Sequence, residues 1–250
     1  MGICAGCLQN EPLLQSHIIP EWVYKYIYTK DHKFVALDAD GIGSPKVEQK
    51  GLREELLCFD CEQHLSKYEN SVADLFKQII GKQFTTASCD VLSSDIKVIG
   101  NYDYNSLKIF CLSVLWRLGV SKRIEYEKYD LGPYKEQLRK IVFNSINTDW
   151  NEYPVMLNQI VMDNAKYSDI IIAHNPGKYK HKTMYSITMA GINVDIILDP
   201  NYKEIDNQIM FIGSKYFVLM DMEISELGIS KKIITRVKSD EIRDFYAKHK

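Results

Sequence analysis

Four of the six cysteines stand in two identical pairs, each with two residues between its members. The pairs are Cys4 with Cys7 and Cys58 with Cys61. Two thiolates spaced in this way on a tight turn can face one tetrahedral ion, and two such turns complete a four-sulfur shell. In a chain with no recognisable secretory signal, this pattern favours metal ligation over disulfides. The spacing therefore predicts one structural Zn²⁺ bound by all four cysteines, with a redox dithiol as the alternative.

Other side chains that could do chemistry lie between and just after the cysteine pairs. His17 precedes two β-branched residues and Pro20, so we expect it on a short strand that stops at the proline. Arg53 precedes the second pair, and Glu62 follows it at the start of a predicted helix. An imidazole can act as a general base, a carboxylate can bind a divalent cation, and a guanidinium can contact a phosphate. The alternatives are a structural histidine, a helix-capping carboxylate and a surface ion pair.

The order of these motifs is similar to that of the zinc-containing HNH endonucleases. The resemblance rests on the first cysteine pair, on Ser-His-Ile-Ile-Pro at 16–20, and on the Leu-Cys-x-x-Cys that leads into a helix at 57–61. More narrowly, the chain resembles a group of bacterial HNH-like proteins without an assigned activity. That group shares the later Leu-Ser-Val-Leu-Trp-Arg helix at 112–117 and the Leu-Gly-Pro turn at 131–133. The HNH resemblance covers roughly residues 1–70.

The resemblance implies a ββα module that holds one catalytic divalent cation, Mg²⁺ or Mn²⁺, beside the structural zinc. It implies that His17 is the general base that activates water. It also implies that Glu62 replaces the family's metal-binding helix histidine, and that Arg53, near the family's asparagine, orients the phosphate. Ser16 stands where the family usually has Asp or His, and a neutral hydroxyl is a poor Mg²⁺ ligand.

The activity implied by the resemblance is a metal-dependent endonuclease that hydrolyses DNA phosphodiester bonds, in defence against phage or mobile elements. Because the family's asparagine and last histidine are missing, a second function stays open: a catalytically inactive zinc module that binds nucleic acid or a partner protein. A third is a sensor whose C-terminal sheet binds a small molecule. The expected partner is nucleic acid, DNA more than RNA, and a homodimer would suit double-strand cleavage.

Charge limits where a polyanion could bind. The formal net charge of −2 excludes a protein that is basic over its whole surface. Residues 1–70 hold seven Lys/Arg and eleven Asp/Glu, and a zinc bound by four thiolates adds about −2. Binding of nucleic acid depends largely on neutralised phosphates, so it needs a local basic surface. The candidates are the turn with Lys178, Lys180 and Lys182 and the basic tail at 231–250, with solvated charged loops as the alternative.

Hydrophobic periodicity predicts an α+β fold. We expect helices where apolar residues recur at helical spacing, at 62–80, 106–120, 134–146 and 239–248. We expect strands in short β-rich runs, at 96–99, 155–162, 169–174, 183–189, 194–198, 208–212 and 216–220. Their hairpin-like spacing predicts an antiparallel sheet. The expected organisation is an N-terminal zinc-bound HNH-like ββα module at 1–81, packed on helices and a C-terminal antiparallel sheet at 82–250.

The composition is that of a folded chain in water. Apolar residues make up 46% of the sequence and charged residues 26%, which excludes wholesale disorder. No apolar run reaches the ~18 residues that span a bilayer, so we expect no membrane segment. The N-terminus lacks a basic segment followed by an apolar one, so we expect no secretory signal and a cytoplasmic location.

Overall fold

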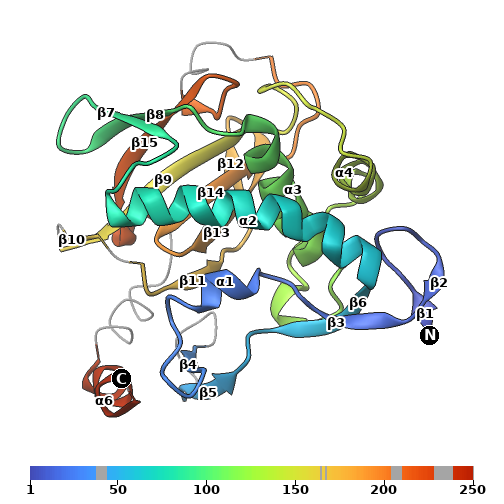
Figure 1. Ribbon diagram of the computed structural model, residues 1–250, viewed down its shortest axis with the longest axis horizontal. Helices are drawn as coiled ribbons and strands as arrows, with labels where there is room; N and C mark the ends of the chain where they lie inside the picture. Colours follow the sequence, from blue (N-terminus) through green and yellow to red (C-terminus); the bar gives the residue numbers. More distant parts are fainter. Residues whose placement is uncertain (38–43, 164, 167, 204–209, 228–238, 250) are drawn as a thin grey trace.

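The computed structural model describes residues 1–37, 44–163, 165–166, 168–203, 210–227 and 239–249. These residues form a mixed α+β structure with one large sheet, helices packed on it, and an N-terminal region of short strands (Figure 1). The α+β class predicted from the periodicity is confirmed. No helix within the described residues is long and apolar enough to cross a membrane.

Within the described residues, nine strands form one sheet, which is the largest layer. Its path is β11-β13-β14-β9-β15-β8-β7, and β10 and β12 pair with β9 and β13 beside that path. The strands are β7 (Ser88–Val91), β8 (Ile96–Gly100), β9 (Val155–Met162), β10 (Ala165–Lys166), β11 (Ile171–Ala173), β12 (Gly177–Tyr179), β13 (Lys182–Met189), β14 (Ile192–Ile197) and β15 (Tyr216–Glu223).

The sheet is mixed, so the expectation of a purely antiparallel sheet is wrong at one pairing. β15 runs parallel to β9, with Leu219 opposite Leu157, whereas the other described pairs are antiparallel. The reason is topological. β14 pairs with one side of β9, and the chain then crosses to the other side and returns in the direction of β9.

The segment 208–212, expected as a strand, contributes no strand where the structure describes it. Residues 208 and 209 lie outside the described residues, and 210–212 adopt no strand. The N–H of Ile212 donates to the carbonyl of Val155 at 2.8 Å, and Phe211 packs edge-on against Tyr202. The apolar side chains that predicted a strand belong instead to a small aromatic cluster.

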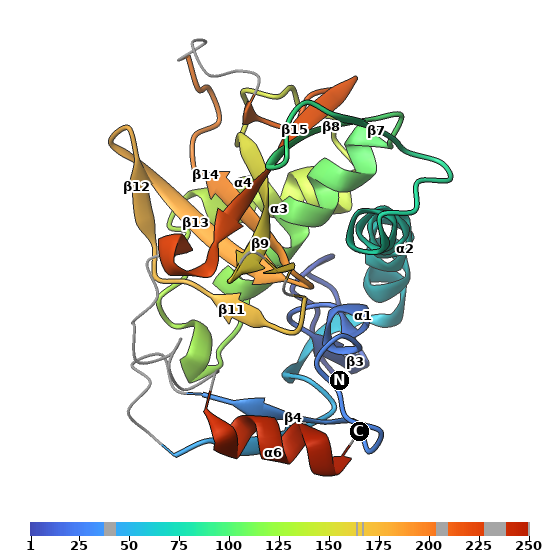
Figure 2. The same cartoon turned by 90° about the vertical axis from the view of Figure 1, so that its left-hand side faces the viewer.

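Two long helices cover one face of the sheet in successive layers. α3 (Tyr104–Val120) lies between the sheet and α2 (Phe59–Gly81), as Figure 2 shows. Residues 106–118 of α3 are all buried, which fits a helix that is apolar on every side. α4 (Tyr134–Phe143) packs against α3 and ends three residues before the predicted end, and Ser145 beyond it has a left-handed φ of 51°.

The N-terminal region consists of two-stranded ribbons and a one-turn helix. The ribbons are β1 (Gly2–Ile3) with β2 (Asn10–Glu11), β3 (Leu13–His17) with β6 (Arg53–Cys58), and β4 (Lys33–Ala36) with β5 (Lys46–Gln49). The short helix is α1 (Glu21–Tyr24). Because Cys58 ends β6 and Phe59 begins α2, the ribbon of β3 and β6 leads directly into the helix in a strand–strand–helix order.

The remaining short elements lie after α3 and at the C-terminal end. They are the 3₁₀ turns η1 (Ile124–Tyr126) and η3 (Ile224–Leu227) and the helix α6 (Asp240–His249). The predicted helix at 239–248 is therefore confirmed. α6 lies beside β4, where the hydroxyl of Tyr246 accepts a hydrogen bond from the N–H of Val35 at 3.3 Å (Figure 2). Residues 231–238 of the basic tail lie outside the described residues.

A buried arginine joins the N-terminal ribbon to both long helices. Arg117 on α3 is 2% exposed. Its Nη1 donates to the carbonyl of His17 at 3.0 Å and lies 2.8 Å from the carboxylate of Glu69 on α2. Its Nε and Nη2 have no partner among the described residues. A cation is tolerated in this apolar helix because a largely buried carboxylate is held against it.

We predict that Arg117→Met lowers the free energy of unfolding by about 3–5 kcal/mol, because it leaves the Glu69 carboxylate without its partner. The double variant with Glu69→Leu should recover part of that loss, since no uncompensated charge remains. Urea unfolding followed by circular dichroism measures both. Arg243→Met is the control, because it breaks an exposed pair with Asp240 and should cost less than about 1 kcal/mol. Equal losses in Arg117→Met and the control would contradict the assignment.

Candidate metal centre and histidine site

The four paired cysteines converge on one point. Two lie in the turn between β1 and β2, one ends β6, and one lies in the first turn of α2. The sulfur atoms of Cys4, Cys7, Cys58 and Cys61 all lie within 4.8 Å of one another. The distance from Cys7 Sγ to Cys58 Sγ is 3.8 Å, which matches the edge of about 3.8 Å in a tetrahedron with Zn–S bonds of ~2.3 Å. The cluster is compatible with a structural metal such as zinc.

Backbone hydrogen bonds shape the turn that carries the first pair. The N–H of Cys4 donates to the carbonyl of Gln9, and the N–H of Leu8 donates to the carbonyl of Cys4, both at 2.9 Å. Leu8 takes a left-handed φ of 64° to close this turn. The N–H of Cys58 then donates to Cys4 Sγ at 3.2 Å, so the second pair is tied to the first through a sulfur atom.

Glycine is required at position 6 by close packing. A Cβ atom on Gly6 would lie 2.8 Å from Cys61 Sγ and 2.8 Å from the ring of Phe143. The carbonyl of Gly6 accepts a hydrogen bond from Arg139 Nη1 at 2.6 Å. α4, which carries both Phe143 and Arg139, therefore packs against the cysteine cluster.

The electrostatics of the cluster favour a bound cation. Burial opposes ionisation of Cys4, but N–H groups of Cys58, Cys7 and Gly6 donate to its sulfur and lower its pKa to about 7. Burial and the neighbouring sulfurs of Cys4 and Cys58 raise the pKa of Cys61. The thiol of Cys4 thus ionises readily, and its negative charge disfavours ionisation of the neighbouring thiol of Cys61. A divalent cation would remove that conflict, because metal binding deprotonates thiols.

His17 lies at the end of β3, opposite Arg53 on β6. The side chain is 21% exposed. Its Nε2 lies 3.1 Å from the carbonyl oxygen of Lys50 and also contacts the carboxylate of Glu21. Lys50 and Gly51 have left-handed φ values of 67° and 66°, and this turn directs the Lys50 carbonyl at the imidazole.

The neighbours of His17 along the ribbon differ in what they contact. Ser16 is 1% exposed, and its Oγ accepts a hydrogen bond from the N–H of Leu57 at 3.1 Å. Successive strand residues face opposite sides, so this hydroxyl points away from the imidazole. The carbonyl of Arg53 accepts a hydrogen bond from Arg123 Nη1 at 3.2 Å. The guanidinium of Arg53 has no hydrogen bond or ion pair with any residue that the structure describes.

Glu62 lies in the first turn of α2, just after the cysteine end of the ribbon. There Cys58 pairs with Leu13, four residues and about 13 Å along β3 from His17. The Oε1 atom of Glu62 is buried and has no partner among the described residues. Within those residues the cysteine tetrad is the one group of three or more ligating side chains. The ribbon therefore pairs His17 with Arg53 and leaves Glu62 near the cysteines.

Sequence reasoning missed the two groups that contact the His17 ring. Glu21 stands four residues after His17, and the intervening Pro20 precedes α1, which turns the chain back toward the strand. The spacing of four residues between His17 and Glu21 is a sequence signal from which this contact could have been predicted. The carbonyl of Lys50 carries no such signal, because its position depends on a left-handed turn that lysine rarely adopts.

The predicted basic turn forms the tip of the hairpin between β12 and β13. Lys178 Nζ donates to Thr183 Oγ1 at 2.9 Å, and Lys182 Nζ lies 2.8 Å from the carboxylate of Asp199. Lys180 lies at the tip with a left-handed φ of 42°. Lys178 and Lys182 are therefore engaged within the hairpin or with its neighbour, and Lys180 is not free of contacts either.

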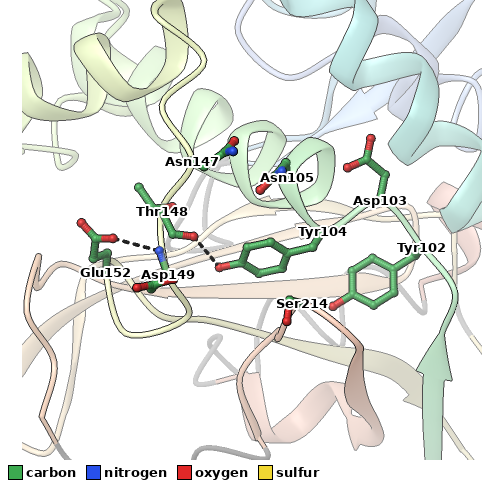
Figure 3. A pocket seen from close by; sticks show the side chains of 9 residues that line it. All are labelled: Tyr102, Asp103, Tyr104, Asn105, Asn147, Thr148, Asp149, Glu152 and Ser214. Carbon is green, nitrogen blue, oxygen red and sulfur yellow. Dashed lines mark hydrogen bonds between the residues drawn. The ribbon is translucent and has the colours of Figure 1, made fainter.

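A cavity of about 480 Å³ opens beside the N-terminal end of α3 (Figure 3). Its walls are mainly polar: the hydroxyl of Tyr104 donates to the carbonyl of Thr148 at 2.9 Å, and Glu152 accepts from the N–H of Asp149 at 2.8 Å. Arg117, which contacts the His17 strand, lies 13 residues further along α3, about 20 Å away. None of the predicted site residues lines this cavity.

Comparisons with protein-family models, with curated proteins and with solved structures found no match for this chain.

We predict that the purified protein holds about one metal ion per chain, and that Cys58→Ser removes it, because a tetrahedral sulfur shell loses one of its four ligands. Elemental analysis by mass spectrometry measures the ion, and the melting temperature should fall with it. Cys89→Ser is the matched control, because Cys89 lies on β7 outside the cluster. An unchanged metal content in Cys58→Ser would contradict the assignment.

Proposed function

We propose that this protein is an HNH-like endonuclease that hydrolyses phosphodiester bonds in DNA, with a structural zinc bound by the cysteine tetrad. A role in defence against phage or mobile elements follows from the sequence resemblance alone. The observation that carries the catalytic part of the proposal is the environment of His17. One ring nitrogen faces two hydrogen-bond acceptors, and the other has no partner among the described residues.

The contacts of Nε2 determine which nitrogen of His17 can act as a base. A carbonyl oxygen and an ionised carboxylate can only accept hydrogen bonds, so the nitrogen that faces Lys50 O and Glu21 must carry the hydrogen. In a neutral imidazole the lone pair is then on Nδ1. Such a fixed tautomer is what a general base needs, because its orientation is set before the proton arrives.

The proposed reaction uses groups of this chain that lie side by side on the ribbon. Nδ1 of His17 takes a proton from water while the water oxygen bonds to phosphorus, and the bond from phosphorus to the leaving sugar oxygen breaks. The leaving oxygen is protonated by solvent. Arg53, opposite His17, provides positive charge to the phosphate because its guanidinium has no partner among the described residues.

A catalytic Mg²⁺ or Mn²⁺ remains part of the proposal only as an ion supplied in the assay. Glu62 is the carboxylate that the resemblance assigns to it, and the unpartnered Oε1 of Glu62 is free to accept a ligand. No second group of ligating side chains gathers around Glu62 within the described residues. For that reason no step of the reaction is assigned to the ion.

A second function, a catalytically inactive zinc module that binds nucleic acid or a partner protein, is favoured by a separate observation. Ser16, the residue before His17, is buried, and its Oγ already accepts a hydrogen bond from the N–H of Leu57. The carbonyl of His17 is bound by Arg117, a cation already paired with Glu69. Neither group is available to a divalent cation at the end of β3.

We predict that the protein nicks plasmid DNA in Mg²⁺ or Mn²⁺ and that His17→Ala slows nicking about 100-fold or more, the usual contribution of a general base. Gel electrophoresis of supercoiled plasmid measures the rate. His181→Asn, at the tip of the β12–β13 hairpin, is the matched control and should keep the wild-type rate. Metal content and circular dichroism must match in all three proteins.

Two results would contradict the catalytic proposal. Equal nicking by His17→Ala and the wild type would exclude His17 as the base. No nicking by a metal-loaded wild-type protein that still binds DNA would favour the inactive module. Glu62→Gln, assayed over a range of Mn²⁺ concentrations, tests whether Glu62 binds the catalytic ion. If it does, the substitution raises the Mn²⁺ concentration needed for the half-maximal rate; if it does not, that concentration stays the same.

A further inference from the structure

The cavity at the N-terminal end of α3 is lined by polar side chains only. Each of the nine lining residues labelled in Figure 3 carries a hydrogen-bonding group, and three of them are carboxylates: Asp103, Asp149 and Glu152. No Lys, Arg or His occurs among the lining residues that the structure describes. The volume of about 480 Å³ is within the range of small-molecule sites. The wall of the cavity therefore has the charge that suits a small cation.

The three carboxylates are not neutralised by ion pairs. Asp103 caps α3, where it accepts hydrogen bonds from the N–H of Ser106 at 3.0 Å and from its Oγ at 2.6 Å. Glu152 accepts from the N–H of Asp149 at 2.8 Å. In the described part of the chain the carboxylate of Asp149 has no hydrogen bond, and none of the three is in an ion pair. All the donors are uncharged, so the negative charges remain.

The positive charges near the cavity lie outside its lining. Lys108 is 1% exposed, and its Nζ donates to the carbonyl of Tyr153 at 2.8 Å. Burial lowers the pKa of Lys108 to about 7, so at neutral pH its amine carries only part of a charge. Lys203 and Lys215 are exposed, which leaves their ammonium groups in water. The N-terminus of α3 contributes about half a positive charge, which Asp103 offsets.

Two side chains in the wall report on its surroundings. Burial raises the pKa of Tyr104, and the negative charges of Asp149 and Glu152 raise it further, so the field at this hydroxyl is negative. Thr148 is 6% exposed, and its Oγ1 is buried with no hydrogen-bond partner among the described residues. Such an unpartnered hydroxyl costs free energy. A hydrogen-bond donor held in the cavity would supply the missing partner.

The carboxylates stand at two ends of the cavity. In Figure 3, Asp149 and Glu152 lie beside the hydroxyl end of Tyr104, and Asp103 lies on the other side of that ring. Within the described residues, the cysteine tetrad is the one place where three or more ligating side chains gather around a point. The three carboxylates are therefore too far apart to bind one metal ion together. A longer ligand with a positive charge at each end would reach both groups.

We propose that this cavity binds an aliphatic di- or polyamine. One ammonium group lies against Asp149 and Glu152, and another lies against Asp103. The methylene groups between them lie on the ring of Tyr104, which lines the cavity between the two ends. The cavity is about 20 Å along α3 from Arg117, which contacts the His17 strand. The inference is therefore independent of the proposed nuclease reaction.

The test is a calorimetric titration of the full-length protein with spermidine, a linear triamine, at low salt. The triple variant Asp103→Ser, Asp149→Asn and Glu152→Gln should weaken binding about tenfold or more, because every carboxylate of the lining is removed. Asp103→Ser keeps a side chain that caps α3 well, and Glu152→Gln keeps an acceptor for the N–H of Asp149. The pair Asp149→Asn and Glu152→Gln, which leaves the cap intact, should also weaken binding.

Matched controls make the test specific. Glu11→Gln with Asp90→Asn and Asp244→Asn removes three carboxylates from exposed positions outside the cavity and should leave the Kd within about twofold. Butylamine, which has a single ammonium group, should bind about tenfold more weakly than spermidine, because it reaches only one end. Circular dichroism and metal content must match in all the proteins.

Three outcomes would overturn the inference. The first is no binding of spermidine by the wild-type protein. The second is an equal loss of affinity in the cavity variant and in the control variant, which would show attraction to net charge alone. The third is binding of Ca²⁺ or Mg²⁺ that displaces spermidine and is lost in the cavity variant, which would show a metal site.

Discussion

The convergence of four thiols on one point is the constraint on which the N-terminal half depends. The two cysteine pairs are separated by residues 8–57, and their closure brings β3 alongside β6 and starts α2 at a fixed place. A short ribbon of this kind has little apolar core of its own, so a bound metal would contribute directly to its folding. The register that follows puts His17 opposite Arg53, at the end of the ribbon away from the cysteines.

A second interaction transmits this arrangement to the rest of the molecule. Arg117 holds the carbonyl of His17 and the carboxylate of Glu69 from inside the most buried helix, which itself packs on the sheet. The ribbon, α2 and α3 are therefore fixed relative to one another by a buried charge as well as by apolar packing. The same geometry places the cysteine tetrad at one end of the ribbon and the pair of His17 and Arg53 at the other.

The sequence predicts well what depends on neighbours along the chain. The cysteine spacing predicts the tetrad, the apolar period of 62–80 predicts α2, and the β-branched run of 155–162 predicts β9. It predicts poorly what depends on chain crossings and turns. The parallel pairing of β15 with β9 follows from a crossover, and the Lys50 carbonyl reaches His17 only through two left-handed residues. The approach of Arg123 to Arg53 spans 70 residues and has no local signal.

The central claim is that the surroundings of His17 fix its proton on Nε2 and leave Nδ1 as the base. Two-bond proton–nitrogen correlation spectra of the ¹⁵N-labelled protein at pH 8, where an ordinary histidine is neutral, test this most directly. The signals of His17 are assigned by their loss in His17→Ala. We expect a protonated Nε2 and an unprotonated Nδ1. A proton on Nδ1, or an even mixture of the two forms, would contradict the account.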